Sequence, residues 1–127
     1  MKRSIFISIL FLFAVTLKAQ SSIDWKFEKT VNGVSVYRGY KCYDNCSYQL
    51  FLVKLKNETS YNKKINIGDI YFKSYSTDLG KVNGATYTLK AYETIAGEKY
   101  GLLWNVPRGW ENKATGFFST ITVENIQ

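Results

Sequence analysis

The segment Tyr48–Lys56 reads Tyr-Gln-Leu-Phe-Leu-Val-Lys-Leu-Lys. On an extended chain, alternate residues from Phe51 to Leu55 lie on one face, and Leu50 and Leu52 lie on the other. Only a strand that is covered on both faces can carry so much apolar surface. We therefore expect this segment to be the central strand of a β-sheet, ended by the polar turn residues that follow it.

The residues before this segment predict a β-hairpin. Ile23, Trp25 and Phe27 alternate with charged residues, which is the period-two pattern of a strand with one face in the core. Asn32-Gly33 then supplies the two positive φ angles of a tight type I′ turn, and a β-branched run follows it. We expect paired strands on either side of this turn, with Trp25 in the core.

The residues after the central segment predict further short strands at 64–67, 70–76, 86–92 and 117–125. In the last of these, Phe117, Ile121 and Val123 are expected to face the same side. The Gly- and Asn-rich segment 77–85 is expected to be a loop. The segment 94–116 is expected to be a long loop that contains one strand near 99–104.

These patterns give about seven short strands, and no segment shows a sustained 3.6-residue apolar repeat. The predicted fold class is therefore all-β, and a two-sheet sandwich accounts for strands of this number and spacing. Removing a leader of 19 residues from the 127 leaves 108 residues, enough for one core and too few for two. We expect residues 20–127 to form a single β-sandwich domain.

The leader itself has the features of a cleavable signal peptide, residues 1–19. Lys2 and Arg3 form the positive n-region, Ser4–Leu17 is an apolar core, and Ala19 is a small residue at the cleavage site. The apolar run is shorter than the roughly 20 residues that a membrane-spanning helix needs. The first cysteine, Cys42, lies far from the cleavage site. We expect an exported protein, periplasmic or extracellular, that is not a lipoprotein and inserts no segment into the membrane after cleavage.

Composition excludes several classes of function. Three basic residues leave with the leader, so the formal net charge falls from +7 to +4, and the remaining lysines are scattered along the chain. Nucleic acid is therefore not expected as a partner. Histidine is absent, which excludes Ser-His-Asp and Cys-His catalysis and every zinc site that contains histidine. The carboxylates show no paired or calcium-loop pattern, so we expect no enzyme, cofactor or metal.

Cys42 and Cys46 are the only cysteines. In an oxidising compartment we expect them to form a local disulfide that closes a turn. The alternative, a redox or metal motif, is less favoured because the spacing is not Cys-x-x-Cys and the chain offers no third soft ligand. A bridged loop would present Tyr43 to solvent, which makes Tyr43 a candidate binding residue.

Aromatic residues concentrate in the segment 94–116. Tyr100, Trp104 and Trp110 lie there, with Arg108 and the only proline between the two tryptophans. Exposed tryptophan beside arginine can stack on sugar rings or anchor a protein partner, because the ring buries a large area at little entropic cost. These four residues are candidate partner-binding or ligand-binding residues. The alternative is that Trp104 caps the open end of the sandwich.

Three features of the chain resemble the small immunoglobulin-like sandwich domains of exported bacterial envelope proteins. They are the run Gly33–Tyr37, the strand Leu50–Leu55 closed by Asn57-Glu58-Thr59, and the terminal strand. Asn57-Glu58-Thr59 also matches the N-glycosylation sequon and doubles as an ordinary turn. The resemblance implies adhesion, ligand binding or a subunit role. We expect a non-catalytic interaction module, an accessory subunit or adaptor held by a protein subunit of an envelope or surface complex. The alternative is a carbohydrate-binding module that uses the loop aromatics to bind a glycan.

Overall fold

The computed structural model describes residues 23–43, 48–107 and 114–126. Its regular elements are β1 (Lys26–Val31), β2 (Val34–Tyr43), β3 (Tyr48–Asn57), β4 (Asn62–Ile67), β5 (Ile70–Ser74), β6 (Thr77–Val82), β7 (Thr86–Leu89), β8 (Thr94–Ala96), the 3₁₀ turn η1 (Glu98–Tyr100), β9 (Leu103–Asn105), β10 (Ala114–Phe118) and β11 (Ile121–Ile126). The predicted all-β class is confirmed. Within these ranges no helix has the length and apolar character that crossing a bilayer requires.

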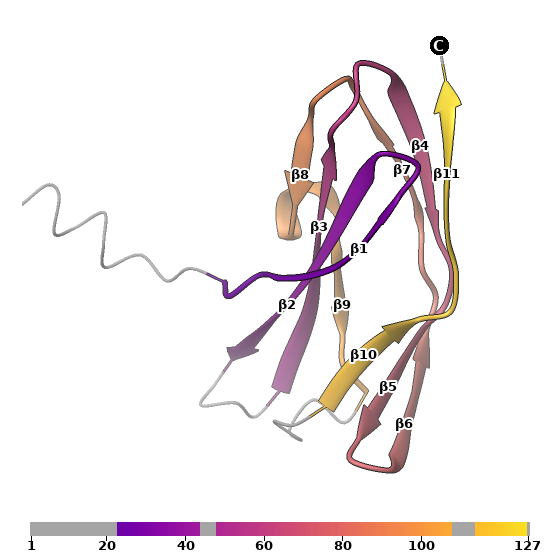
Figure 1. The fold of residues 1–127 in the computed structure, drawn as a ribbon. Coiled ribbons are helices and arrows are strands. Elements are labelled where there is room, and N and C mark those ends of the chain that lie inside the picture. The colour runs from indigo at the N-terminus through magenta and orange to yellow at the C-terminus, as the bar shows by residue number, and fades with distance from the viewer. Residues whose placement is uncertain (1–22, 44–47, 108–113, 127) are drawn as a thin grey trace, which may run out of the picture.

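The first sheet is built around β3, in the order β1-β2-β3-β8, with β9 also pairing with β3 (Figure 1). β2 pairs along the whole of one edge, from Val34 opposite Asn57 to Tyr43 opposite Tyr48. β8 and β9 share the other edge. The predicted central position of this strand is confirmed, and its residues from 49 to 53 are all buried.

The predicted hairpin is also confirmed, since Asn32 and Gly33 have φ angles of 43° and 79° between β1 and β2. The predicted core position of Trp25 is wrong. β1 begins only at Lys26, and a Cβ atom on Gly39 would overlap Ile23 and lie 3.2 Å from the Trp25 ring. Ile23 and Trp25 therefore cross the outer face of the first sheet, apart from the residues of the shared core.

The second layer consists of two three-stranded sheets, β10-β5-β6 and β11-β4-β7. The same three stretches of chain form both sheets, because β4 continues into β5, β6 into β7 and β10 into β11 (Figure 1). All three stretches are interrupted at one level. Backbone hydrogen bonds of 2.9 Å cross that level, from Gly68 N to Thr120 O and from Ile67 N to Ala85 O. The two sheets are therefore the halves of one bent layer.

This bend explains where the strand prediction differs from the structure. The described residues contain eleven strands where about seven were expected, because β4-β5, β6-β7, β8-β9 and β10-β11 are each interrupted once. Most of the predicted loop 77–85 is strand β6, paired with β5. Phe117 and Ile121 do not face the same side: Phe117 is exposed and Ile121 is buried, because Ser119-Thr120 shifts the alternation between β10 and β11.

One hydrophobic core lies between the two layers, the arrangement of a β-sandwich. Its buried members come from both layers: Val34, Val36, Phe51, Val53, Leu55, Ile65, Ile67, Ile70, Phe72, Leu79, Leu89, Ile95, Leu102, Val106, Ala114 and Ile121. Phe51 is at the centre of an aromatic cluster. Its ring centroid lies 5.5 Å from those of Tyr40 and Phe72, 5.7 Å from Phe118 and 6.3 Å from Trp104.

Side chains join the layers along both open sides of the sandwich. On one side, Arg38 Nη1 donates to the carbonyl oxygen of Gly116 (2.8 Å), and Gly116 N donates to the Tyr40 hydroxyl (2.9 Å). Burial raises the pKa of Tyr40 above its ordinary value of 10.0. On the other side, Trp104 Nε1 donates to the carbonyl oxygen of Asn83 at 2.8 Å. These bonds fix one layer against the other.

Gly116 is required for close packing of β10 on the core. A Cβ atom there would lie 2.8 Å from the Phe51 ring and 3.0 Å from the Phe72 ring. We expect Gly116→Ala to lower the free energy of unfolding by about 1–3 kcal/mol, because both rings would leave their preferred rotamers. Urea denaturation measures the change. Combining the substitution with Phe51→Leu should cost less than the sum of the two single changes, whereas simple additivity would contradict the proposed overlap.

Candidate functional site

The structure gives Tyr100 and Trp104 different surroundings. Tyr100 lies in η1, within an excursion from Gly97 to Leu102 between β8 and β9, and the residue is 41% exposed. The Trp104 ring is partly buried against the core and donates its hydrogen bond across to Asn83. Trp104 therefore closes one side of the sandwich, whereas the alternative drawn from the sequence placed it at the open end. Arg108 and Trp110 lie outside the described residues.

The predicted disulfide also reaches beyond the described residues. Cys42 lies in β2 opposite Gln49, and Tyr43 lies opposite Tyr48. Cys46 is outside the described ranges, so the Cys42–Cys46 bridge and the outward presentation of Tyr43 stay predictions.

A dense hydrogen-bond network lies at the end of the sandwich where three turns meet. We call this region the loop end; it comprises residues 32–33, 58–61 and 90–93. Its centre is Asn57, the last residue of β3, which is 1% exposed. The Asn57 amide donates to the carbonyl oxygens of Tyr61 (2.7 Å) and Lys90 (2.9 Å), and it accepts from the Thr59 backbone (3.1 Å) and hydroxyl (2.7 Å). Both donors and both lone pairs of the amide are thus used.

Backbone hydrogen bonds tie the same loops together. Tyr92 N donates to Thr59 O at 3.0 Å, Asn57 N to Glu93 O at 2.9 Å, and Glu58 N to Gly33 O at 2.9 Å. Gly33 has no room for a side chain, because a Cβ atom would overlap the Thr59 methyl group. The β1–β2, β3–β4 and β7–β8 connections therefore form one rigid unit rather than three independent loops.

The loop end presents two tyrosine side chains to solvent. Tyr61 is 61% exposed and Tyr92 is 67% exposed. Lys63 is buried, donates to the side-chain oxygen of Asn125, and holds its ammonium nitrogen 5.8 Å from the Tyr61 ring centroid. The two rings are thus displayed on a framework whose backbone is already fixed.

Tyr92 also has an unusual backbone. Its φ angle is +59°, in the left-handed region that a bulky side chain rarely adopts and that glycine or asparagine occupies at lower cost. Such residues persist when the surrounding structure determines them strongly, and they cluster at binding and catalytic sites. Tyr92 therefore combines an exposed side chain with a backbone conformation that the surrounding hydrogen bonds hold in place.

Sequence reasoning missed this site. The Asn57-Glu58-Thr59 triplet was identified only as a turn and a glycosylation sequon, whereas the structure buries the Asn57 amide and uses both of its hydrogens. Glycan attachment to Asn57 in the folded protein is thereby excluded. The available signal was a polar turn segment with a tyrosine in each of two loops. Nothing in the sequence states that these loops adjoin.

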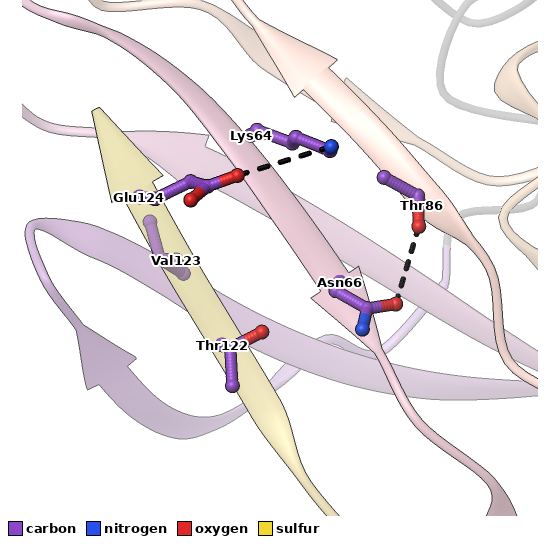
Figure 2. A pocket seen from close by; sticks show the side chains of 6 residues that line it. All are labelled: Lys64, Asn66, Thr86, Thr122, Val123 and Glu124. Atoms are coloured by element: carbon purple, nitrogen blue, oxygen red, sulfur yellow. Dashed lines mark hydrogen bonds and ion pairs between the residues drawn. The ribbon is translucent and has the colours of Figure 1, made fainter. Parts of the chain in front are cut away.

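A polar concavity of about 240 Å³ lies on the outer face of β11-β4-β7, and its lining residues are Lys64, Asn66, Thr86, Thr122, Val123 and Glu124 (Figure 2). Two pairs of these side chains interact across the strands. Lys64 and Glu124 form an ion pair of 3.8 Å, and the Thr86 hydroxyl donates to Asn66 Oδ1 at 3.1 Å. We interpret this surface as an ordinary solvated sheet face.

Comparison with known proteins finds no matching family model, no matching curated protein and no matching solved structure. Over the described ranges, no three potential metal ligands come together. The described residues therefore form a two-layer, β-sandwich-like all-β fold with two exposed tyrosines at the loop end.

Proposed function

We propose that the protein is an exported, non-catalytic interaction module, an accessory subunit or adaptor of a bacterial cell-envelope or surface complex, and that it binds a protein partner through the loop end. The observation that carries this proposal is the display of Tyr61 and Tyr92 on loops fixed by the Asn57 network. Export rests on the predicted signal peptide, residues 1–19.

The physical support is preorganisation. A tyrosine has only two side-chain torsions to order on binding and offers a large surface with a polar end. Because the loop backbones are already hydrogen bonded, a partner would not have to order them, which removes a major cost of association. The other exposed residues of the loop end are Asn32, Glu58, Ser60, Lys90 and Ala91. Tyrosine, serine and asparagine are enriched in the binding loops of antibodies.

The titratable groups whose pKa values shift lie apart from the loop end. Among the described residues, the pKa values that shift clearly are those of Tyr40 and Tyr87, raised by burial, and that of Lys81, raised by its hydrogen bond to Asp69. These residues lie in β2, β7 and β6, and none belongs to the loop end. Catalytic sites concentrate perturbed groups in one cleft, and this pattern favours structural causes instead.

The immunoglobulin-like class remains part of the proposal at the level of architecture. Two antiparallel layers around one core support it. The strand order within the sheet differs from that of immunoglobulin constant domains. Here β2 lies between β1 and β3, whereas in constant domains the second strand lies between the first and the fifth. The carbohydrate-binding alternative based on Tyr100 and Trp104 receives less support, since the Trp104 ring is partly buried and its indole N–H is already bonded.

A capture experiment with matched variants tests the proposed function. The tagged protein is expressed in its own organism, its complexes are cross-linked and purified, and the captured proteins are quantified by mass spectrometry. We expect Tyr61→Ala combined with Tyr92→Ala to reduce capture of the partner at least about tenfold, a loss of about 1.4 kcal/mol in binding free energy. The melting temperature should change little, because both side chains are exposed. At position 92, alanine and tyrosine both carry a Cβ atom, so the strain of the positive φ angle is similar in the variant and the wild type.

Tyr75→Ala is the matched control. Tyr75 is also an exposed tyrosine with a positive φ angle, but it lies in the β5–β6 turn at the opposite end of the sandwich. Capture should survive this change. Equal capture by the double variant and the wild type would contradict a role of the loop end in binding.

A further inference from the structure

The outer face of β10-β5-β6 carries a second group of exposed aromatic rings. Phe117 lies opposite Tyr71, which in turn lies opposite Lys81, so these three residues form one row across the sheet. Lys73 and Asp78 are opposite each other in the next row. Phe117 is 46% exposed and Tyr71 is 41% exposed.

These rings line an open concavity on the sheet surface. Its volume is about 420 Å³, and its lining consists of Tyr71, Lys73, Asp78 and Phe117. This volume falls within the range of sites that bind small organic ligands. Two aromatic side chains thus form one part of the lining, and a cation and a carboxylate form another.

Strand alternation does not explain these aromatics. On β5 the core side is already filled by Ile70 and Phe72, so Tyr71 belongs to the solvent side, where a polar residue would suffice. The other half of the same layer has polar residues on its solvent side. Its outer face carries lysine, glutamate, asparagine and threonine around a polar concavity (Figure 2). The aromatic pair is therefore a local departure from the pattern of this layer.

The charges around the rings are balanced. Lys73 and Lys81 are offset by Asp69 and Asp78, and Lys81 Nζ lies 3.1 Å from Asp69 Oδ2. Asp78 Oδ1 accepts a hydrogen bond from Gly80 N at 2.9 Å. A nucleic acid or an anionic lipid would need a net positive surface, which this face does not provide. The balance of donors and acceptors suits a neutral ligand that carries many hydroxyl groups.

We propose that the outer face of β10-β5-β6 binds a neutral carbohydrate chain. The apolar C–H faces of pyranose rings would stack on Phe117 and Tyr71, because an aromatic face is electron-rich and attracts C–H groups. Sugar hydroxyls would accept from Lys73 and donate to Asp78, and hydrogen bonds to charged groups are stronger than neutral ones. This site is separate from the loop end and does not depend on the proposed protein partner.

A titration followed by NMR tests the proposal. The isotope-labelled mature protein is titrated with a panel of neutral hexasaccharides, namely those of β-1,4-glucose, α-1,4-glucose, β-1,4-xylose, β-1,4-mannose and β-1,4-N-acetylglucosamine. We expect at least one to shift amide signals of β5 and β10. Tyr71→Ala and Phe117→Ala should each weaken this binding at least about tenfold, whereas Phe117→Tyr, which keeps an aromatic ring, should retain it.

Two controls separate this site from the rest of the molecule. Thr86→Ala removes a side chain from the neighbouring polar face and should leave sugar binding unchanged, as should the Tyr61→Ala and Tyr92→Ala pair. Circular dichroism and urea midpoints verify that each variant is folded. The proposal is overturned if no hexasaccharide shifts the signals of this sheet, or if binding survives both Tyr71→Ala and Phe117→Ala. Loss of protein capture in these two variants, without sugar binding, would instead identify this face as a protein-binding surface.

Discussion

Replacing Phe51 with alanine is expected to lower the free energy of unfolding by about 3–5 kcal/mol. Phe51 is fully buried in the central strand and contacts four other aromatic rings, contributed by both layers and by the edge strand β9. Truncation removes the transfer free energy of the ring and leaves a cavity between layers that side-chain hydrogen bonds hold in place. Urea denaturation at constant pH measures the loss.

Tyr71→Ala provides the comparison for this experiment. Tyr71 is also an aromatic residue of a strand, but its side chain points to solvent and should cost less than about 1 kcal/mol. A loss below about 1.5 kcal/mol for Phe51→Ala would show that the layers collapse around the vacancy. In that case the side-chain bridges between the layers would not be rigid, and the aromatic cluster would not be the centre of the core.

Replacing Asn57 with alanine is expected to cost about 3 kcal/mol, because it leaves the carbonyl oxygens of Tyr61 and Lys90 and the backbone N–H of Thr59 without their partner. The rigid loop end should also become mobile. Hydrogen exchange at the Tyr92 amide, which donates to Thr59 O, should accelerate strongly relative to amides in β3. Denaturation and exchange together measure both effects.

Asn57→Asp sharpens the same test. The carboxylate keeps the acceptors for Thr59 but replaces both amide donors with lone pairs that face the carbonyl oxygens of Tyr61 and Lys90. Its cost should therefore equal or exceed that of alanine near neutral pH. Thr59→Val, which removes only one hydroxyl, should cost about 1 kcal/mol. A stable Asn57→Asp protein with a slowly exchanging Tyr92 amide would refute the role of the network.

The sequence predicted those elements whose signals are local. The hairpin at Asn32-Gly33 follows from the two positive φ angles that this dipeptide tolerates, and the central strand follows from an apolar run that only two covered faces can accommodate. In each case the deciding residues are adjacent in the chain. The predicted core position of Trp25 is wrong because Trp25 lies beside Gly39. That position depends on the path by which the chain enters the sheet, which local alternation does not indicate.

The bend could not be predicted, because it depends on three segments that meet only in the folded chain. Gly84 shows the reason: a Cβ atom there would overlap the carbonyl oxygens of Ile67 and Gly68. Reading the alternation straight through Ser119-Thr120 placed Phe117 on the same side as Ile121, whereas the interruption leaves Phe117 exposed and Ile121 buried. The aromatic face of β10-β5-β6 was missed for the same reason. The loop end was missed because Asn57 acts on Lys90, 33 residues away.

The side-chain bonds that join the layers also determine how other molecules can approach. Arg38 and Tyr40 bind both backbone polar groups of Gly116, and Asn32 Nδ2 donates to the carbonyl oxygen of Val123 at 3.0 Å. The outer edge formed by β10 and β11 therefore presents an interrupted row of backbone hydrogen-bonding groups. An unpaired strand edge is a template for aggregation and for domain swapping. The interrupted row therefore makes this edge a poor template for either process, and it disfavours strand addition by another chain at this edge.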